Sequence, residues 1–213
     1  MSGIDSVIRK LKDLKHILLT DAQGKSFIKI NDDISFEVPS WINNIFQNAS
    51  LINEQYQYVF LGFEALSKED IIDFYNSRNS GKGFYSAYDI DKNLNVGEDK
   101  YILLEDDFQN ELENPIEIKN LAGLIPIFFF QGDYITFNLS QNEEKGLMII
   151  NDGYNATTLS PDVINHLEDL IDGLTEGSYK LDDGELIYPS SWYQRKKLRS
   201  GELDMDEYGE ILD

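Results

Sequence analysis

The segment 124–177 constrains the fold of this chain more than any other part of the sequence. Residues 124–130 are almost entirely apolar, and residues 147–150 form a second apolar run. Between them, Ile135, Phe137 and Leu139 alternate with Tyr134, Thr136 and Asn138, which is typical of a strand with one covered face. Gln131-Gly132-Asp133 and Asp152-Gly153 predict turns, and 141–145 is a polar turn. We therefore expect a meander of three strands, with a fourth over 154–158.

An amphipathic helix is predicted directly after this meander. Ser160 suits an N-cap, Pro161 suits the first helical position, and Gly177 suits the stop. Between them, apolar residues recur at helical spacing: Val163, Ile164, Leu167, Leu170, Ile171 and Leu174. A helix with this stripe packs on the sheet, so the expected fold class is α+β. We expect a single domain with a central, mostly antiparallel sheet and flanking helices.

The N-terminal third predicts a mixture of helices and strands. Apolar spacing indicates helices over 6–18 and after Ser67, where Asp70 completes a capping box. Alternation indicates a hairpin over 26–38, ended by Pro39, and a strand over 55–63. Ser40 is expected to cap a helix over 41–48. A short basic helix is expected over 192–199, and we divide the chain into a domain, 1–200, and an acidic tail, 201–213.

Charge and composition limit the classes of partner. The chain has 18 basic and 39 acidic residues, a net charge of −21, and no cysteine. A nucleic-acid binder needs a basic surface, so we expect no nucleic-acid partner. No apolar run is long enough to span a bilayer and no signal core is present, so we expect no membrane partner and a cytoplasmic location. Such a surface attracts basic proteins, although it also serves solubility alone.

Few patterns indicate catalysis. His16 and His166 have no metal-ligand or nucleophile spacing around them, and no Gly-x-Ser-x-Gly elbow or phosphate loop is present. Residues 89–97 superficially resemble a calcium loop, but the glycine and closing glutamate positions of that motif do not fit. We expect no enzymatic activity, no metal and no cofactor.

The candidate partner-binding residues are acidic or aromatic. Large rigid rings dominate binding hot spots, and buried charge pairs contribute affinity. The acidic candidates lie in the irregular segment 84–113, with the densest group at 105–107. The full candidate set is Asp89, Asp91, Glu98, Asp99, Glu105, Asp106, Asp107, Glu111, Tyr134, Trp192 and Tyr193.

The meander and helix resemble the SUKH superfamily, which includes bacterial immunity proteins against polymorphic toxins and fungal regulators of cell-wall synthesis. The resemblance rests on the apolar entry at 124–127, the Gly-Asp turn with its alternating strand at 132–139, the apolar strand at 146–150 and the helix at 160–177. Residues 66–71 also resemble the helix after the first central strand of that family. The early Leu-Pro segment of the family is only faintly present at 38–41.

The resemblance implies an α+β fold, no enzymatic activity and a protein partner. Our leading hypothesis is a bacterial immunity protein that blocks a cognate, basic, nuclease-like toxin, acting as a monomer or weak homodimer. One alternative is a regulator or scaffold that binds a cellular protein. A further alternative is a metal-dependent hydrolase that uses clustered carboxylates.

Overall fold

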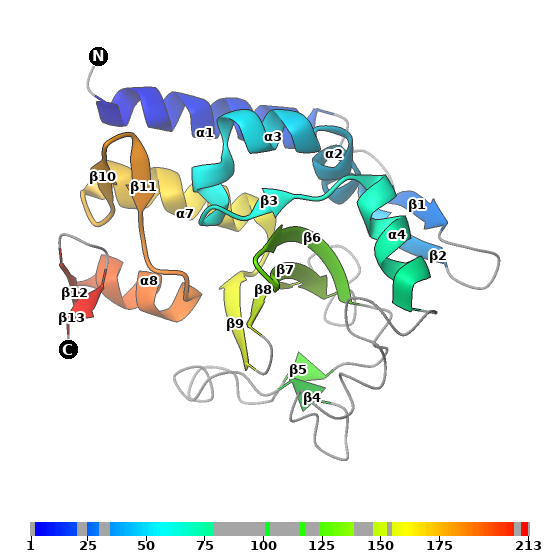
Figure 1. The fold of residues 1–213 in the computed structure, drawn as a ribbon. Coiled ribbons are helices and arrows are strands. Elements are labelled where there is room, and N and C mark those ends of the chain that lie inside the picture. The colour runs from blue at the N-terminus through cyan, green and yellow to red at the C-terminus, as the bar shows by residue number, and fades with distance from the viewer. Residues whose placement is uncertain are drawn as a thin grey trace.

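An antiparallel five-stranded sheet lies at the centre of the computed structural model, with helices above it (Figure 1). The structure describes residues 3–20, 25–29, 35–78, 101–102, 116–117, 124–138, 147–152, 155–206 and 210–212. Helices and antiparallel strands alternate irregularly along the chain, so the predicted α+β fold class is confirmed.

The sheet has the strand order β3-β6-β7-β8-β9, and the four later strands form the predicted meander. Their bounds are β3 Glu64–Ala65, β6 Leu124–Phe130, β7 Asp133–Asn138, β8 Leu147–Asp152 and β9 Asn155–Ser160. Gln131 and Gly132 turn β6 into β7 with φ angles of 48° and 106°, which suit a tight hairpin. Because β3 pairs only with Phe128 and Phe129 of β6, Pro126 needs no amide hydrogen on that side.

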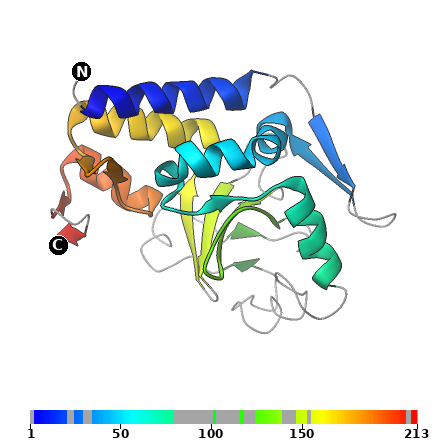
Figure 2. The same ribbon diagram turned by 45° about the horizontal axis from the view of Figure 1, so that its top comes forward.

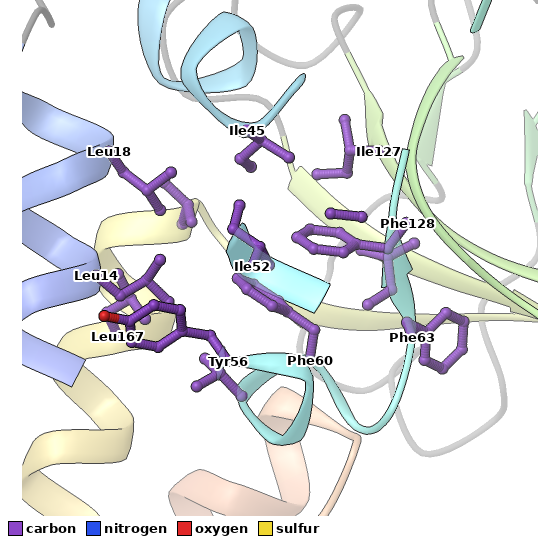
Figure 3. Close-up of a cluster of buried hydrophobic side chains, with 14 of the residues drawn as sticks. Leu14, Leu18, Ile45, Ile52, Tyr56, Phe60, Phe63, Ile127, Phe128 and Leu167 are labelled. Atoms are coloured by element: carbon purple, nitrogen blue, oxygen red, sulfur yellow. The ribbon is translucent and has the colours of Figure 1, made fainter. Parts of the chain in front are cut away.

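Helices pack on one another and on the sheet through a shared apolar core. Their bounds are α1 Gly3–Leu19, α2 Ser40–Gln47, α3 Ala49–Gln55, the 3-10 helix η1 Gln57–Phe60, α4 Lys68–Arg78, α7 Val163–Glu176 and α8 Trp192–Ser200. In both ribbon views α1 runs alongside α7 (Figures 1 and 2). Leu14 and Leu18 of α1 meet Leu167 of α7, and the same cluster continues through Phe60 to Phe128 of the sheet (Figure 3).

Four two-stranded antiparallel pairs complete the part of the fold that the structure describes. The predicted N-terminal hairpin is present as β1 Lys25–Lys29 and β2 Ser35–Pro39. The others are β4 Tyr101–Ile102 with β5 Ile116–Glu117, β10 Lys180–Asp182 with β11 Glu185–Ile187, and β12 Asp204–Met205 with β13 Ile211–Leu212. The last hairpin turns back onto the domain, because Lys180 Nζ donates to the carbonyl of Met205 at 3.0 Å.

The strand predicted over 55–63 is wrong, because this segment is helical. It contains the end of α3 and then η1. Tyr56, Val59, Phe60 and Phe63 are buried, and these positions have the spacing of one helical face. The alternation of Tyr56, Tyr58 and Phe60 was therefore misleading, since Tyr58 is only half-buried.

Two predicted N-caps also need correction. Asp162, not Ser160, caps α7, and its Oδ1 accepts from Asn165 N at 2.7 Å. Ser160 ends β9, and its hydroxyl donates to the carbonyl of Asp162. Ser40 is the first residue of α2 and makes no cap bond, because the N-cap position falls on Pro39. In contrast, the Ser67–Asp70 capping box is confirmed by bonds of 2.7 and 3.2 Å.

Within the described residues, no helix has the length and apolar character needed to cross a membrane.

Candidate functional site

Most of the acidic candidates cannot be placed. Asp89, Asp91, Glu98, Asp99, Glu105, Asp106, Asp107 and Glu111 lie outside the described residues, as does the calcium-like segment 89–97.

The three aromatic candidates are placed, and they do not form one site. Tyr134 lies on β7, while Trp192 and Tyr193 begin α8, which packs beside β9 at the edge of the sheet farthest from β3. The Trp192 ring lies 5.0 Å from the Arg195 guanidinium, and Lys197 Nζ lies 4.2 Å from the Tyr193 ring. Both rings are half-buried, so their contacts within α8 account for part of their surface.

An acidic hollow lies where α3, β3, α4 and β6 meet. It has a volume of about 530 Å³ and is open to solvent. Among its described lining residues, Glu64, Asp70 and Asp73 contribute carboxylates, and none is a lysine or arginine. Asn53, Ala65, Leu66 and Phe129 also line it, so these acidic side chains surround a partly apolar floor.

Local hydrogen bonds fix the shape of this acidic hollow. Asn53 Oδ1 accepts from Ala65 N at 2.6 Å, and Asn53 Nδ2 donates to Ala65 O at 3.1 Å. The Asn53 side-chain amide therefore makes the pair of hydrogen bonds to Ala65 that the backbone of a neighbouring strand would make. Leu66 N then donates to Ile127 O at 3.0 Å, and the Ser67–Asp70 capping box starts α4 directly afterwards. These bonds tie β3 and the start of α4 to α3 and β6 through backbone groups.

The carboxylates of the rim are available for a partner. Asp70 uses one carboxylate oxygen in the capping box. Glu64 and Asp73 have no hydrogen-bond or ion-pair partner among the described residues. Both side chains are exposed. An exposed carboxylate gains only modestly from one surface ion pair, so binding here requires several pairs together.

Phe129 connects the acidic hollow to Tyr134. The two rings lie 5.0 Å apart, and both side chains are half-buried. Burial, with a smaller contribution from Asp133, raises the pKa of Tyr134 to about 12. Tyr134 therefore stays neutral at physiological pH and presents a hydroxyl rather than a charge. Among the candidate partner-binding residues that the structure describes, Tyr134 is the one that packs against a residue lining the acidic hollow.

A second hollow of about 460 Å³ lies between η1, the end of β6 and β11. Tyr58, Phe130, Ile187 and Tyr188 contribute apolar and aromatic surface, and Glu185 is its one charged lining residue among those described. Phe130 is 41% exposed. The described lining of this aromatic hollow carries one carboxylate, against three in the acidic hollow, so we regard the acidic hollow as the better candidate site for a cationic partner.

A buried polar network joins α7, α8 and η1 away from the acidic hollow, and its Tyr188 also lines the aromatic hollow. Arg195, fully buried, donates from Nη1 to Asp169 Oδ2 at 3.0 Å and to His166 Nδ1 at 3.2 Å. Asp169 also accepts from the Tyr179 hydroxyl at 2.7 Å and from Arg199 at 2.8 Å. We name the set His166, Asp169, Tyr179, Tyr188, Arg195 and Arg199 the arginine network.

The arginine network is closed to a substrate. His166 Nε2 lies 2.9 Å from the carbonyl of Val59, which can only accept, so Nε2 carries the proton and Nδ1 accepts from Arg195. Burial and the adjacent Arg195 charge lower the pKa of His166 to about 3. His166 lies on the buried stripe of α7. Its ring is neutral, bonded at both nitrogens and unable to act on a ligand.

Sequence reasoning missed both the acidic hollow and the arginine network. The acidic hollow joins residues that are distant in sequence, and only the Ser67–Asp70 capping box gave a local signal. For the arginine network, the i, i+3 spacing of His166 and Asp169 on an otherwise apolar helical stripe was such a signal. Among the described residues, no group of three histidine or acidic side chains is placed to hold a metal ion.

The chain matches no protein-family model, no curated protein and no solved structure. The resemblance to the SUKH superfamily therefore stays a prediction from the sequence.

Proposed function

We propose that this protein binds a basic protein partner and blocks its active surface, as an immunity protein does with its cognate toxin. The observation that carries the proposal is the acidic hollow, in which Glu64 and Asp73 have no partner among the described residues. The net charge of −21 favours encounter with a cationic partner over long range. The proposal includes a cytoplasmic location, no enzymatic activity and no nucleic-acid partner.

The chemistry of the acidic hollow suits lysine or arginine side chains of such a partner. Glu64 and Asp73 offer carboxylates to the cation, and Phe129 offers a ring face to a guanidinium. Ala65 and Leu66, both buried, contribute apolar surface to the floor. Because the carboxylates are exposed, several charge pairs together supply the affinity, and the acidic surface around them raises the association rate.

Charge reversal tests this proposal. The partner is captured from the source cell or taken as the product of the adjacent gene, and its affinity is measured over a salt series. We expect Glu64→Lys with Asp73→Lys to weaken binding by at least about tenfold, and the salt dependence to become shallower. Asp106→Lys with Asp107→Lys tests the acidic segment predicted from the sequence in the same assay.

A matched control reverses the same number of charges elsewhere. Asp182 and Asp204 are exposed, lie near the C-terminal hairpins and do not line the acidic hollow. Asp182→Lys with Asp204→Lys is expected to change affinity much less than the pair in the hollow. Affinity that responds neither to salt nor to any of these reversals would rule out the electrostatic account.

Co-expression separates an immunity protein from a regulator of a cellular protein. If the partner is a toxin, cells that make both proteins are expected to survive, and the Glu64→Lys, Asp73→Lys variant is expected to lose this protection. A captured partner that is harmless when expressed alone would instead assign the protein a regulatory or scaffold role.

A further inference from the structure

β9 is the last strand of the central sheet, and its free edge needs a cover. The pairing of β9 with β8 shifts near its end, because Met148 faces Ser160 while Ile149 faces Thr158. Leu159 is the extra residue in this bulge, and its carbonyl lacks a regular place in the ladder. An uncovered edge with an unpaired carbonyl is a template for pairing with another chain.

α8 provides that cover with a charged side chain. The Arg195 Nη2 donates to the carbonyl of Leu159, and Arg195 is the one buried residue of α8. Both ribbon views place α8 beside the outer side of β9 (Figures 1 and 2). The rings of Trp192 and Tyr188 lie 5.0 and 5.4 Å from the guanidinium and flank it.

α8 is held far more weakly by apolar contacts than α7 is. α7 buries Val163, Leu167, Leu170 and Leu174. On α8, Leu198 and the rings of Trp192 and Tyr193 are only partly buried, and the remaining side chains are polar or charged. A buried ion pair adds little net stability, because the loss of hydration offsets the attraction. In addition, Arg195 Nε is buried without a hydrogen-bond partner among the described residues.

Glu202 N and Leu203 N donate to the carbonyl of Lys197, which joins the C-terminal hairpin to α8. We propose that α8 and this hairpin form a cover that opens and closes as one unit while the sheet stays folded, and that opening breaks the bonds from Lys180 of β10 to the carbonyls of Met205 and Asp206. The cover comprises residues 190–206 and 210–212, between the exposed Ser190 and the end of β13. When it opens, water reaches Asp169 and Arg195 together, so neither charge is left buried and unpaired. Opening also exposes the edge of β9 at Leu159.

Arg199 is the residue best suited to adjust this opening. It bonds to Asp169 at 2.8 Å and to Glu176 at 2.8 and 2.9 Å, and thereby ties the end of α8 to α7. Removing it leaves Asp169 with Arg195 and Tyr179, so no buried charge loses its last partner. The Arg199→Gln variant is therefore expected to fold.

Hydrogen exchange of the full chain at several times tests the cover. In the wild type, amides of α8 are expected to exchange at least about tenfold faster than those of β6 and β7. Arg199→Gln is expected to raise exchange in α8 about tenfold further and to leave α1, β6, β7 and the β9 amides that bond to β8 unchanged. Glu69→Gln, which removes an exposed charge on α4, is the control and is expected to leave α8 unaffected.

Two results would overturn the proposal. One is a wild type in which α8 is as strongly protected as β6 and β7. The other is an Arg199→Gln variant in which exchange rises equally in every strand of the sheet. Either result means that α8 unfolds only together with the whole domain.

Discussion

His166 illustrates how a titratable residue is fixed by its surroundings in this protein. Its ring stacks on Phe60 at 5.5 Å, and its two nitrogens bond to Val59 and Arg195. The carbonyl of Val59 also accepts from the Tyr188 hydroxyl, whose pKa burial raises well above its usual value. One backbone oxygen of η1 thus joins α7 to the segment before α8.

This environment predicts a specific loss of stability in acid. Burial and Arg195 lower the pKa of folded His166 to about 3, whereas the unfolded value is about 6.5. Below about pH 6.5, His166 binds a proton in the unfolded chain but stays neutral in the folded chain. The free energy of unfolding therefore falls as pH drops toward 3, by up to about 1.4 kcal/mol per pH unit from this group.

Urea unfolding of the wild type and of His166→Gln, between about pH 7 and pH 4, measures this contribution. Glutamine keeps an amide that can donate to Val59 but does not titrate. We expect the variant to have a shallower pH dependence than the wild type. Parallel curves for the two proteins would contradict the assigned neutral histidine.

At the scale of elements, the C-terminal half of α7 depends on a close approach between helix and ring. Tyr179 folds back over Gly173, and both Ser178 N and Tyr179 N donate to the Gly173 carbonyl, at 2.9 and 3.1 Å. A Cβ at position 173 would lie 2.1 Å from the Tyr179 ring. The Tyr179 ring occupies the space that a side chain at position 173 would need, and the Tyr179 hydroxyl donates to Asp169.

Gly173→Ala is therefore expected to destabilise the protein by about 2–3 kcal/mol, although alanine normally favours a helix by about 1 kcal/mol over glycine. Thermal or urea unfolding measures the change, with the exposed Thr175→Ala as a control that is expected to be nearly neutral. In a Tyr179→Ala background the same glycine substitution is expected to become neutral or stabilising. Equal destabilisation in both backgrounds would refute the clash.

The elements that the sequence predicted well are those whose signals are local. The meander, the apolar stripe of α7 and the Ser67–Asp70 capping box each involve residues close in the chain. The prediction for 55–63 failed because Tyr56, Tyr58 and Phe60 alternate as in a strand, whereas the residues that are buried, Tyr56, Val59, Phe60 and Phe63, have helical spacing. The β10–β11 hairpin was missed despite its Asp183-Gly184 turn, which has the φ angles of 44° and 88° expected of such a pair.

The candidate site was less predictable than the fold. The acidic hollow requires α3, β3, α4 and β6 to meet, which no local pattern reports. The basic helix was predicted over 192–199, but its sequence does not indicate that Arg195 is buried or that Arg199 is paired with three carboxylates. Their partners lie on α7, more than 20 positions earlier in the chain.

At the scale of the whole molecule, net charge opposes folding. A chain with 39 acidic and 18 basic residues repels itself more strongly when compact than when unfolded. Salt screens exposed charges at distances beyond about 8–10 Å at physiological strength, but it affects buried pairs such as Arg195–Asp169 much less.

We therefore expect the free energy of unfolding at pH 7 to rise by about 1 kcal/mol between roughly 0.02 and 0.5 M sodium chloride, because repulsion is screened. Potassium chloride is the control for specific ion binding and is expected to give the same curve. Stability that falls with salt would mean that exposed pairs such as Arg199–Glu176 outweigh the repulsion.

The Asn53 amide that pairs with Ala65 has a consequence for how this protein behaves at high concentration. A bare strand at the end of a sheet invites neighbouring molecules to add strands in register, which is a route to insoluble fibres. Here the backbone of Ala65 is already occupied by a side chain of its own molecule. An Asn53→Leu variant would keep the apolar floor of the acidic hollow. It would also free the backbone of Ala65 and so restore this route to aggregation.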